Sequence, residues 1–101
     1  MKCSRSNFAL TVVDNMVYVF GGIQNKGSGH APIMPSIVAE KYDPIQDKWE
    51  TVEIAGAQSI GAFGWTTLGS PEKLLIVGGT DGEMLQDTCM IVDFKEGKAT
   101  N

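Results

Sequence analysis

MVYVFGG, at residues 16–22, returns in altered form as LLIVGG at residues 74–79. In both places a short apolar run ends in two glycines, and the glycine pairs stand about 57 residues apart. Because the chain has 12 glycines and only 4 prolines, this pairing is the most distinctive feature of its composition. A recurring pattern of this kind indicates a structural repeat, so we expect two copies of one unit within the 101 residues.

Each copy is predicted to begin with a β-hairpin. A second apolar stretch precedes the glycine-ended run, at residues 8–13 in the first copy and 60–68 in the second. Asp14 and Asn15 connect the first two stretches, and both residue types tolerate the positive φ of a tight turn. A looser turn at residues 69–73 connects the second two. Two apolar runs joined in this way are typical of paired antiparallel strands.

Two further strands are expected in each copy. Residues 37–42 and 88–92 are rich in strand formers, and residues 48–52 alternate in polarity, so that one side should meet water. In the second copy the fourth strand is reduced to residues 98–101 and is either degenerate or truncated. Residues 16–20 are apolar at every position, which predicts an inner strand covered on both faces.

A helix is the rival interpretation of the third element. Ser36 could cap such a helix, and residues 83–86 are good helix formers. The Val and Ile content and the turn-forming pair Asp43 and Pro44 favour a strand instead.

These residues resemble the kelch repeat, a unit of about 50 residues that forms one four-stranded antiparallel blade of a β-propeller. Six residues separate Tyr42 from Trp49, as in the family pattern, whereas the second copy has Val92 and Ala99 at these two places. The family motif is carried here by Arg5, Gly21, Gly22, Tyr42, Asp43, Trp49, Gly78, Gly79 and Asp93. The resemblance implies an all-β fold made of kelch-type propeller blades, a partial propeller with a first blade at residues 1–53 and a second at 54–101.

The motif residues have physical roles that fit this resemblance. Tyr42 and Trp49 are expected to fill the wedge between two packed sheets, with a polar tip that reaches the backbone. Their replacement by Val92 and Ala99 predicts looser packing at the outer edge of the second blade. Glycine pairs at strand ends permit positive φ and a close approach of neighbouring backbone.

Charge and cysteine content exclude several functional classes. A net charge of −4 argues against nucleic acid or an anionic membrane as the main partner. The apolar runs are far shorter than the roughly 20 residues of a membrane-spanning helix, and no export signal is recognisable. Cys3 and Cys89 form no zinc or CxxC pattern, so we expect free thiols and a cytoplasmic, intracellular protein, with a disulfide as the alternative.

Little in the sequence indicates catalysis. His30 is the sole histidine and lies in a glycine-rich loop, without a Ser/His/Asp pattern around it. Gly27 and Gly29 lack the context of a phosphate-binding loop, and no EF-hand spacing links the acidic residues. Tyr18 and Tyr42 lie within strand patterns, so the copper site of galactose-oxidase-type propellers is poorly supported. We therefore expect no catalytic residue, no cofactor and no metal.

The resemblance places partner contacts on the loops between the second and third strands, at residues 23–35 and 80–85, and on the linker at 53–59. The first loop is long, and long loops in compact domains are often functional. Its mixture of polar and apolar groups suits a protein or peptide. The candidate contacts are Gln24, Asn25, Lys26, Ser28, His30, Met34, Asp81 and Glu83. A variable loop without a ligand is the alternative.

These observations favour a non-catalytic protein–protein interaction module, a fragment of a larger propeller protein that acts as a scaffold or substrate-recruiting adaptor. The alternative is a fragment of a propeller enzyme, galactose-oxidase-like or sugar-acting, whose active site lies in other blades. Two blades alone would leave two apolar faces uncovered, so further blades of a parent chain or self-association are expected as well.

Overall fold

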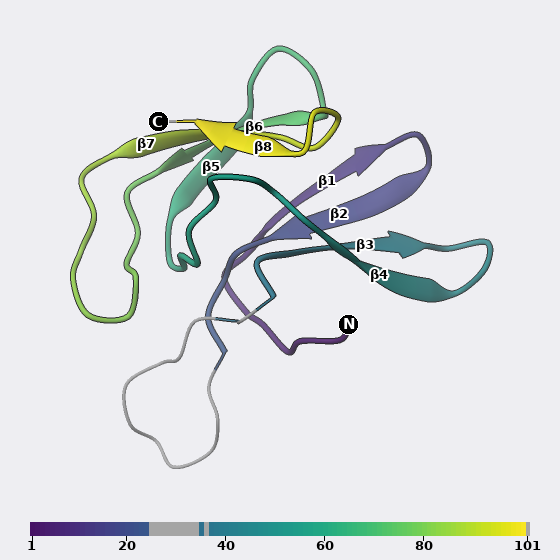
Figure 1. Cartoon of the computed structure of the whole chain (residues 1–101), viewed down its shortest axis with the longest axis horizontal. Coiled ribbons are helices and arrows are strands. Elements are labelled where there is room, and N and C mark those ends of the chain that lie inside the picture. Colours follow the sequence, from purple (N-terminus) through teal and green to yellow (C-terminus); the bar gives the residue numbers. More distant parts are fainter. Residues whose placement is uncertain (25–34, 36, 101) are drawn as a thin grey trace.

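The computed structural model describes residues 1–24, 35 and 37–100. These residues form two four-stranded antiparallel sheets, each with its strands in sequence order, and contain no helix (Figure 1). The first sheet comprises β1 (Ala9–Val13), β2 (Met16–Phe20), β3 (Ala39–Asp43) and β4 (Lys48–Val52). The second comprises β5 (Gly64–Thr67), β6 (Lys73–Val77), β7 (Cys89–Asp93) and β8 (Lys98–Thr100). The all-β class and the four-stranded units are confirmed, and the helix considered for the third element is not formed.

Turn residues fix the hairpins. Asp14 and Asn15 adopt φ values of 52° and 63°, as the two-residue turn between β1 and β2 requires. The apolar stretch at residues 60–68 was expected to be one strand, but β5 begins only at Gly64. Ala62 has a φ of 53°, which interrupts the extended backbone, and Asn7 has a similar φ of 55° ahead of β1. The same kink therefore precedes the first strand of both sheets.

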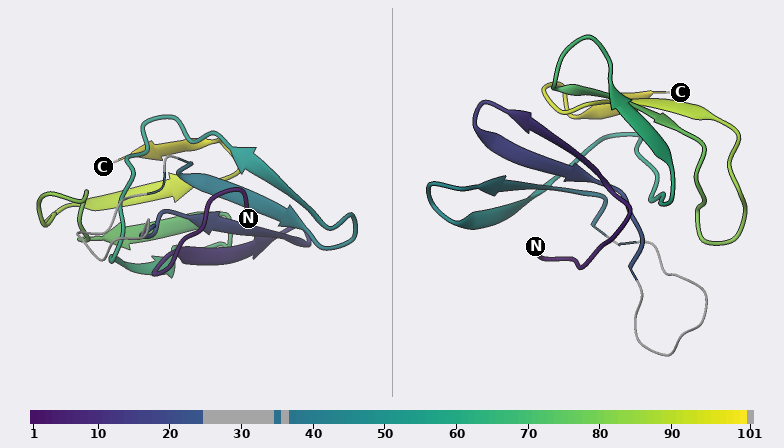
Figure 2. Two further views of the ribbon diagram at one scale, coloured as in Figure 1. Left: turned by 90° about the horizontal axis from the view of Figure 1, so that it is seen from below. Right: turned by 180° about the vertical axis from the view of Figure 1, so that it is seen from behind.

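The two sheets pack face to face with β1 beside β5 (Figure 2). The shared core consists of Ala9, Phe20, Ala39, Ile60, Leu74, Ile76, Met90, Val92, Phe94 and Ala99. Aromatic rings bridge the sheets, since the Tyr18 and Phe94 centroids lie 4.8 Å apart and those of Phe20 and Phe63 lie 6.2 Å apart. Burial of these side chains is the main force that holds the sheets together.

The inner strand β2 is covered less evenly than its composition predicts. Val19 and Phe20 are fully buried on opposite faces of the sheet, but residues 16–18 are only half-buried. Cover over the Val19 face comes from the N-terminal segment, where Cys3 is buried and the Lys2 amide donates a hydrogen bond to Glu40. The rest of that outer face is open, with Leu10 at 43% and Val12 at 52% exposure.

The glycine pair at the end of β2 is required by close packing. Gly21 has a φ of 68°, and a Cβ there would lie 2.6 Å from the carbonyl oxygen of Ile60. Only a residue without a side chain permits this contact between the sheets.

Tyr42 and Trp49 do not lie between the two sheets of this chain, contrary to the expectation. Strand alternation directs both to the outer face of the first sheet, where their rings lie 4.9 Å apart and Tyr42 donates to the Asp47 carboxylate at 2.6 Å instead of to backbone. The expected looser packing at Val92 and Ala99 is also wrong. Both are buried between the sheets, because at this contact small side chains leave room for the stacked Tyr18 and Phe94 rings.

The short fourth strand of the second sheet is formed. β8 pairs with β7 through three residues, and Ala55 of the linker lies along the other side of β8. The Ala99 amide donates to the Ala55 carbonyl at 2.7 Å, and the Ala55 amide donates to Gly97 at 2.8 Å. The linker therefore caps a strand that would otherwise end the sheet as a bare edge.

Candidate functional site

Three connections meet at the end of the molecule where β2 and β6 finish (Figure 1). The Gly22 amide donates to the Ile60 carbonyl at 2.8 Å, and the Ser59 hydroxyl donates to the Pro35 carbonyl at 2.8 Å. Gly61 and Thr80 exchange two backbone hydrogen bonds at 2.9 and 3.0 Å. We call this end the loop face. Its described residues are Gly22, Pro35, residues 59–61 and residues 79–86.

The loop between β6 and β7 is the best described part of the loop face. Asp81 organises it, since one of its carboxylate oxygens accepts the amides of Glu83 and Met84 at 2.9 Å each. The Thr80 hydroxyl donates to the Met84 carbonyl at 3.0 Å, and the Gln86 amide donates to Gly79 at 2.7 Å. The loop therefore has a fixed conformation that costs little further entropy on binding.

The same hydrogen bonds determine the charge of Asp81. The Met84 amide, and after it the Glu83 amide, lower the pKa of the Asp81 carboxyl. The carboxylate is thus ionised at neutral pH and serves to shape the loop. Glu83, the other acidic candidate from the sequence, has an exposed side chain beside it.

Two exposed apolar side chains lie at the tip of this loop. Met84 is 68% exposed and Leu85 is 87% exposed. Sequence reasoning placed both in the partner-facing loop at residues 80–85 but did not name them among the candidate contacts. The signal available was an apolar pair placed between Gly82 and Asp87 in a polar loop, outside any strand pattern. Ordered apolar groups of this kind are common anchors in protein interfaces.

Most candidate contacts in the first loop lie outside the described residues. Those residues are Asn25, Lys26, Ser28, His30 and Met34. Gln24 is described and is half-buried at the start of the connection.

A buried ion pair stands at the base of that first connection. Arg5 and Glu40 lie 2.9 Å apart with both side chains fully buried. Arg5 also donates to the carbonyls of Gly21, Ile37 and Val38, at 2.9, 2.8 and 3.0 Å. It thereby ties the end of β2 to the segment that enters β3. Sequence reasoning named Arg5 but missed Glu40, because only strand pairing brings the two together.

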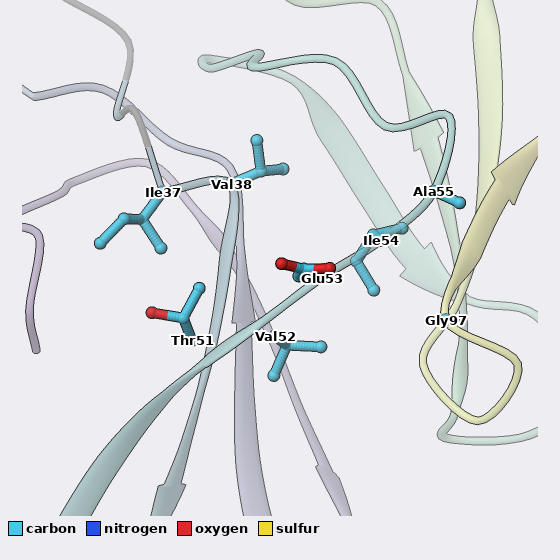
Figure 3. Close-up of a pocket in the computed structure, with 8 residues that line it drawn as sticks. All are labelled: Ile37, Val38, Thr51, Val52, Glu53, Ile54, Ala55 and Gly97. Carbon is cyan, nitrogen blue, oxygen red and sulfur yellow. The ribbon is translucent and has the colours of Figure 1, made fainter.

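A shallow groove of about 520 Å³ lies where the first half of the linker passes between the sheets (Figure 3). Its lining residues are Ile37, Val38, Thr51, Val52, Glu53, Ile54, Ala55 and Gly97. Glu53 is the one charged side chain of this lining, and no second titratable group faces it there. The groove therefore offers contact surface but no catalytic group. The linker contributes its first residues to this groove and its last residues to the loop face.

The described residues contain no group of three or more His, Cys, Asp or Glu side chains arranged to hold a metal. Cys3 is buried and Cys89 is exposed, and both thiols are free, which confirms that expectation. Within the same part of the chain, no helix is long and apolar enough to cross a membrane.

Comparison with known proteins gives a family match over the first sheet. The profile of the kelch motif matches residues 4–53. Kelch-like protein 15 of Gallus gallus is 33% identical over 98 residues, which cover 96% of this chain and 18% of that protein. An F-box/kelch-repeat protein of Arabidopsis thaliana is 44% identical over 50 residues, which cover 50% of this chain and 12% of that protein. The chain spans less than a fifth of the length of either relative.

Proposed function

Because this chain belongs to the kelch-repeat family, we propose that it is a non-catalytic module that binds a partner protein through the loop face. The observation that carries the proposal is the ordered loop at residues 80–86, which holds Met84 and Leu85 in solvent. A protein gains no stability from exposed apolar side chains, whereas a bound partner would bury them.

The partner is expected to offer an apolar pocket with a basic rim. Leu85 would fill the pocket, while the exposed carboxylates of Glu83 and Asp87 would face lysine or arginine side chains around it. The first loop, residues 23–35, would add contacts from its polar and apolar side chains. Residues 1–53 and 54–101 are the two repeat units that present these loops. A scaffold or adaptor role rests on the resemblance to much longer relatives and would involve parts of such a protein beyond these repeats.

Leu85 and Ile45 provide a matched pair of variants for testing this proposal. Ile45 is 89% exposed in the β3–β4 turn, at the opposite end of its sheet from the loop face. Leu85→Asp and Ile45→Asp therefore make the same change at two equally exposed apolar positions. In quantitative affinity purification with the tagged chain, proteins lost with Leu85→Asp and kept with Ile45→Asp are loop-face partners. If both variants retain every protein bound by the original chain, the proposal is wrong.

A further inference from the structure

The contact between the two sheets is a template for a second contact of the same kind. The inner face of the first sheet receives the second sheet through hydrogen bonds and aromatic contacts, of which three have clear counterparts. Gly22 donates from its amide to Ile60, and Thr11 donates from its hydroxyl to Pro71, both at 2.8 Å. Tyr18 stacks against Phe94.

The outer face of the second sheet repeats this receiving surface. Strand register places Thr66, Leu75 and Val77 where the first sheet has Thr11, Tyr18 and Phe20. In the first sheet Thr11 and Phe20 are buried and Tyr18 is half-buried. Val77, the counterpart of Phe20, is 47% exposed, and Thr66 is exposed as well.

The space in front of this surface is open. A Cβ on Gly21 would lie 2.6 Å from the Ile60 carbonyl oxygen, a group of the other sheet. A Cβ on the equivalent Gly78 would meet only the Gln86 carbonyl of its own loop, at 3.5 Å. Among the described residues, no second sheet lies against Gly78 in the way that Ile60 lies against Gly21.

The surface that matches this receiving surface is the outer face of the first sheet. Its residues Leu10, Val12, Val17, Tyr42 and Trp49 correspond by register to Trp65, Thr67, Leu74, Val92 and Ala99. In the second sheet this face packs on the first sheet, and Leu74 and Val92 are fully buried. In the first sheet it leaves Val12 half exposed.

Side-chain sizes on the two open faces are complementary. Within the chain, the large Tyr18 packs against a cluster that contains the small Val92 and Ala99. On the open faces the sizes are exchanged, since the smaller Leu75 replaces Tyr18 and the larger Tyr42 and Trp49 replace Val92 and Ala99. The larger side chains of one open face thus stand opposite the smaller Leu75 of the other.

We propose that a second copy of this chain docks head to tail, with the outer face of its first sheet on the outer face of the second sheet. The template predicts that Gly79 donates from its amide to the Arg5 carbonyl of the second copy, and that Leu75 packs against Pro44 of that copy. Head-to-tail contacts close into a ring where the rotation between successive sheets allows it, as in propellers. Since closed propellers have about 4 to 8 sheets, the ring holds two to four copies.

Two half-blocked variants test the head-to-tail geometry. Val77→Asp disables the face of the second sheet, and Val12→Asp disables the face of the first. By size-exclusion chromatography with light scattering at about 100 µM, the original chain should have two to four times the 10.9 kDa of one chain. Each variant alone should be monomeric. An equimolar mixture should give a dimer and nothing larger, because it contains one intact pair of faces.

Controls separate loss of contact from loss of folding. Lys95→Glu, at an exposed position in the β7–β8 turn, changes neither open face and should assemble like the original chain. Circular dichroism checks that Val77→Asp is folded. If its spectrum is altered, Thr66→Arg takes its place, because it blocks the same face at an exposed position and should likewise be monomeric. A monomeric original chain, a Val12→Asp variant that dimerises alone, or a mixture that stays monomeric would overturn the proposal. The first of these outcomes would assign the faces to another protein segment.

Discussion

At one equivalent pair of positions, the first sheet buries two charged side chains and the second buries two apolar ones. The first sheet encloses the Arg5–Glu40 ion pair. Strand register and the matching bridges ahead of the first strands place Met90 and Ile60 at the same positions in the second. The backbone around them is alike, since both have the kink ahead of the first strand and a glycine pair after the second. The comparison shows that the fold needs this space filled and does not need it charged.

The ion pair gives the first sheet something that the apolar pair cannot. Arg5 donates to three carbonyls at the base of the β2–β3 connection, whereas isoleucine has no hydrogen-bond donor in its side chain. Desolvation makes a buried ion pair a poor source of stability compared with apolar side chains of similar size. We therefore attribute to Arg5 the joining of the end of β2 to the segment that enters β3, and to Ile60 simple core packing.

The largest predicted effect comes from breaking the ion pair on one side. Glu40→Ala would leave the Arg5 charge buried without its counter-ion and should lower the free energy of unfolding by about 3–5 kcal/mol. Urea denaturation at fixed protein concentration measures the change. The double variant Arg5→Ile with Glu40→Met copies the second sheet and should lie within about 1 kcal/mol of the original chain or above it. A double variant as unstable as Glu40→Ala would contradict the equivalence of the two positions.

A smaller difference is predicted at the glycine pairs. Gly21→Ala adds a Cβ that collides with the Ile60 carbonyl at a strained φ, and should cost about 3 kcal/mol. Gly78→Ala has a similar φ of 70° but open space, so it should cost about 1–2 kcal/mol from strain alone. Denaturation of both variants at a concentration where the chain is monomeric allows the comparison. Equal losses of unfolding free energy in the two variants would mean that the contact between the sheets is not the reason for glycine at position 21.

The aromatic pair of the first sheet predicts a pH effect that the second sheet, with Val92 and Ala99, cannot show. The hydrogen bond to Asp47 raises the pKa of Tyr42, because it favours the neutral phenol. Because the pKa of Tyr42 is raised in the folded state, its hydrogen bond stabilises the fold at pH values below the ordinary tyrosine pKa of about 10. This stabilisation is lost as the pH rises through the raised pKa. Ultraviolet titration should show one tyrosine with a midpoint that falls in Asp47→Asn. An unchanged midpoint would exclude the Asp47 contact as the cause.

The smallest predicted effect concerns the loop at residues 80–86. Asp81→Ala removes the acceptor for the Glu83 and Met84 amides, so hydrogen exchange at these amides should accelerate while β6 and β7 remain protected. The lowered pKa of Asp81 means that this loop order persists above the ordinary carboxyl range and is lost as pH falls through the lowered value. Unchanged exchange in Asp81→Ala would show that the other loop hydrogen bonds suffice.

Local patterns in the sequence predicted the strands and turns well. Asp14 and Asn15 formed the expected turn, and the stretch after the first long connection formed β3. Three features depended on pairing between distant segments and could not be predicted. These are the partner of Arg5, the face occupied by Tyr42 and Trp49, and the pairing of β8 with the linker at Ala55. In the candidate site, the family resemblance placed Asp81 and Glu83 in the loop, but the exposure of Met84 and Leu85 became apparent only from the folded loop.

The central claim is that this chain binds a partner through an apolar anchor on the loop face. Its most direct test is the dissociation constant of a purified loop-face partner for the original chain, Leu85→Asp and Ile45→Asp, measured by isothermal titration calorimetry. Leu85→Asp should weaken binding by at least about tenfold, as expected for loss of an anchor side chain, and Ile45→Asp should leave it unchanged. Equal affinities for all three proteins would contradict the claim.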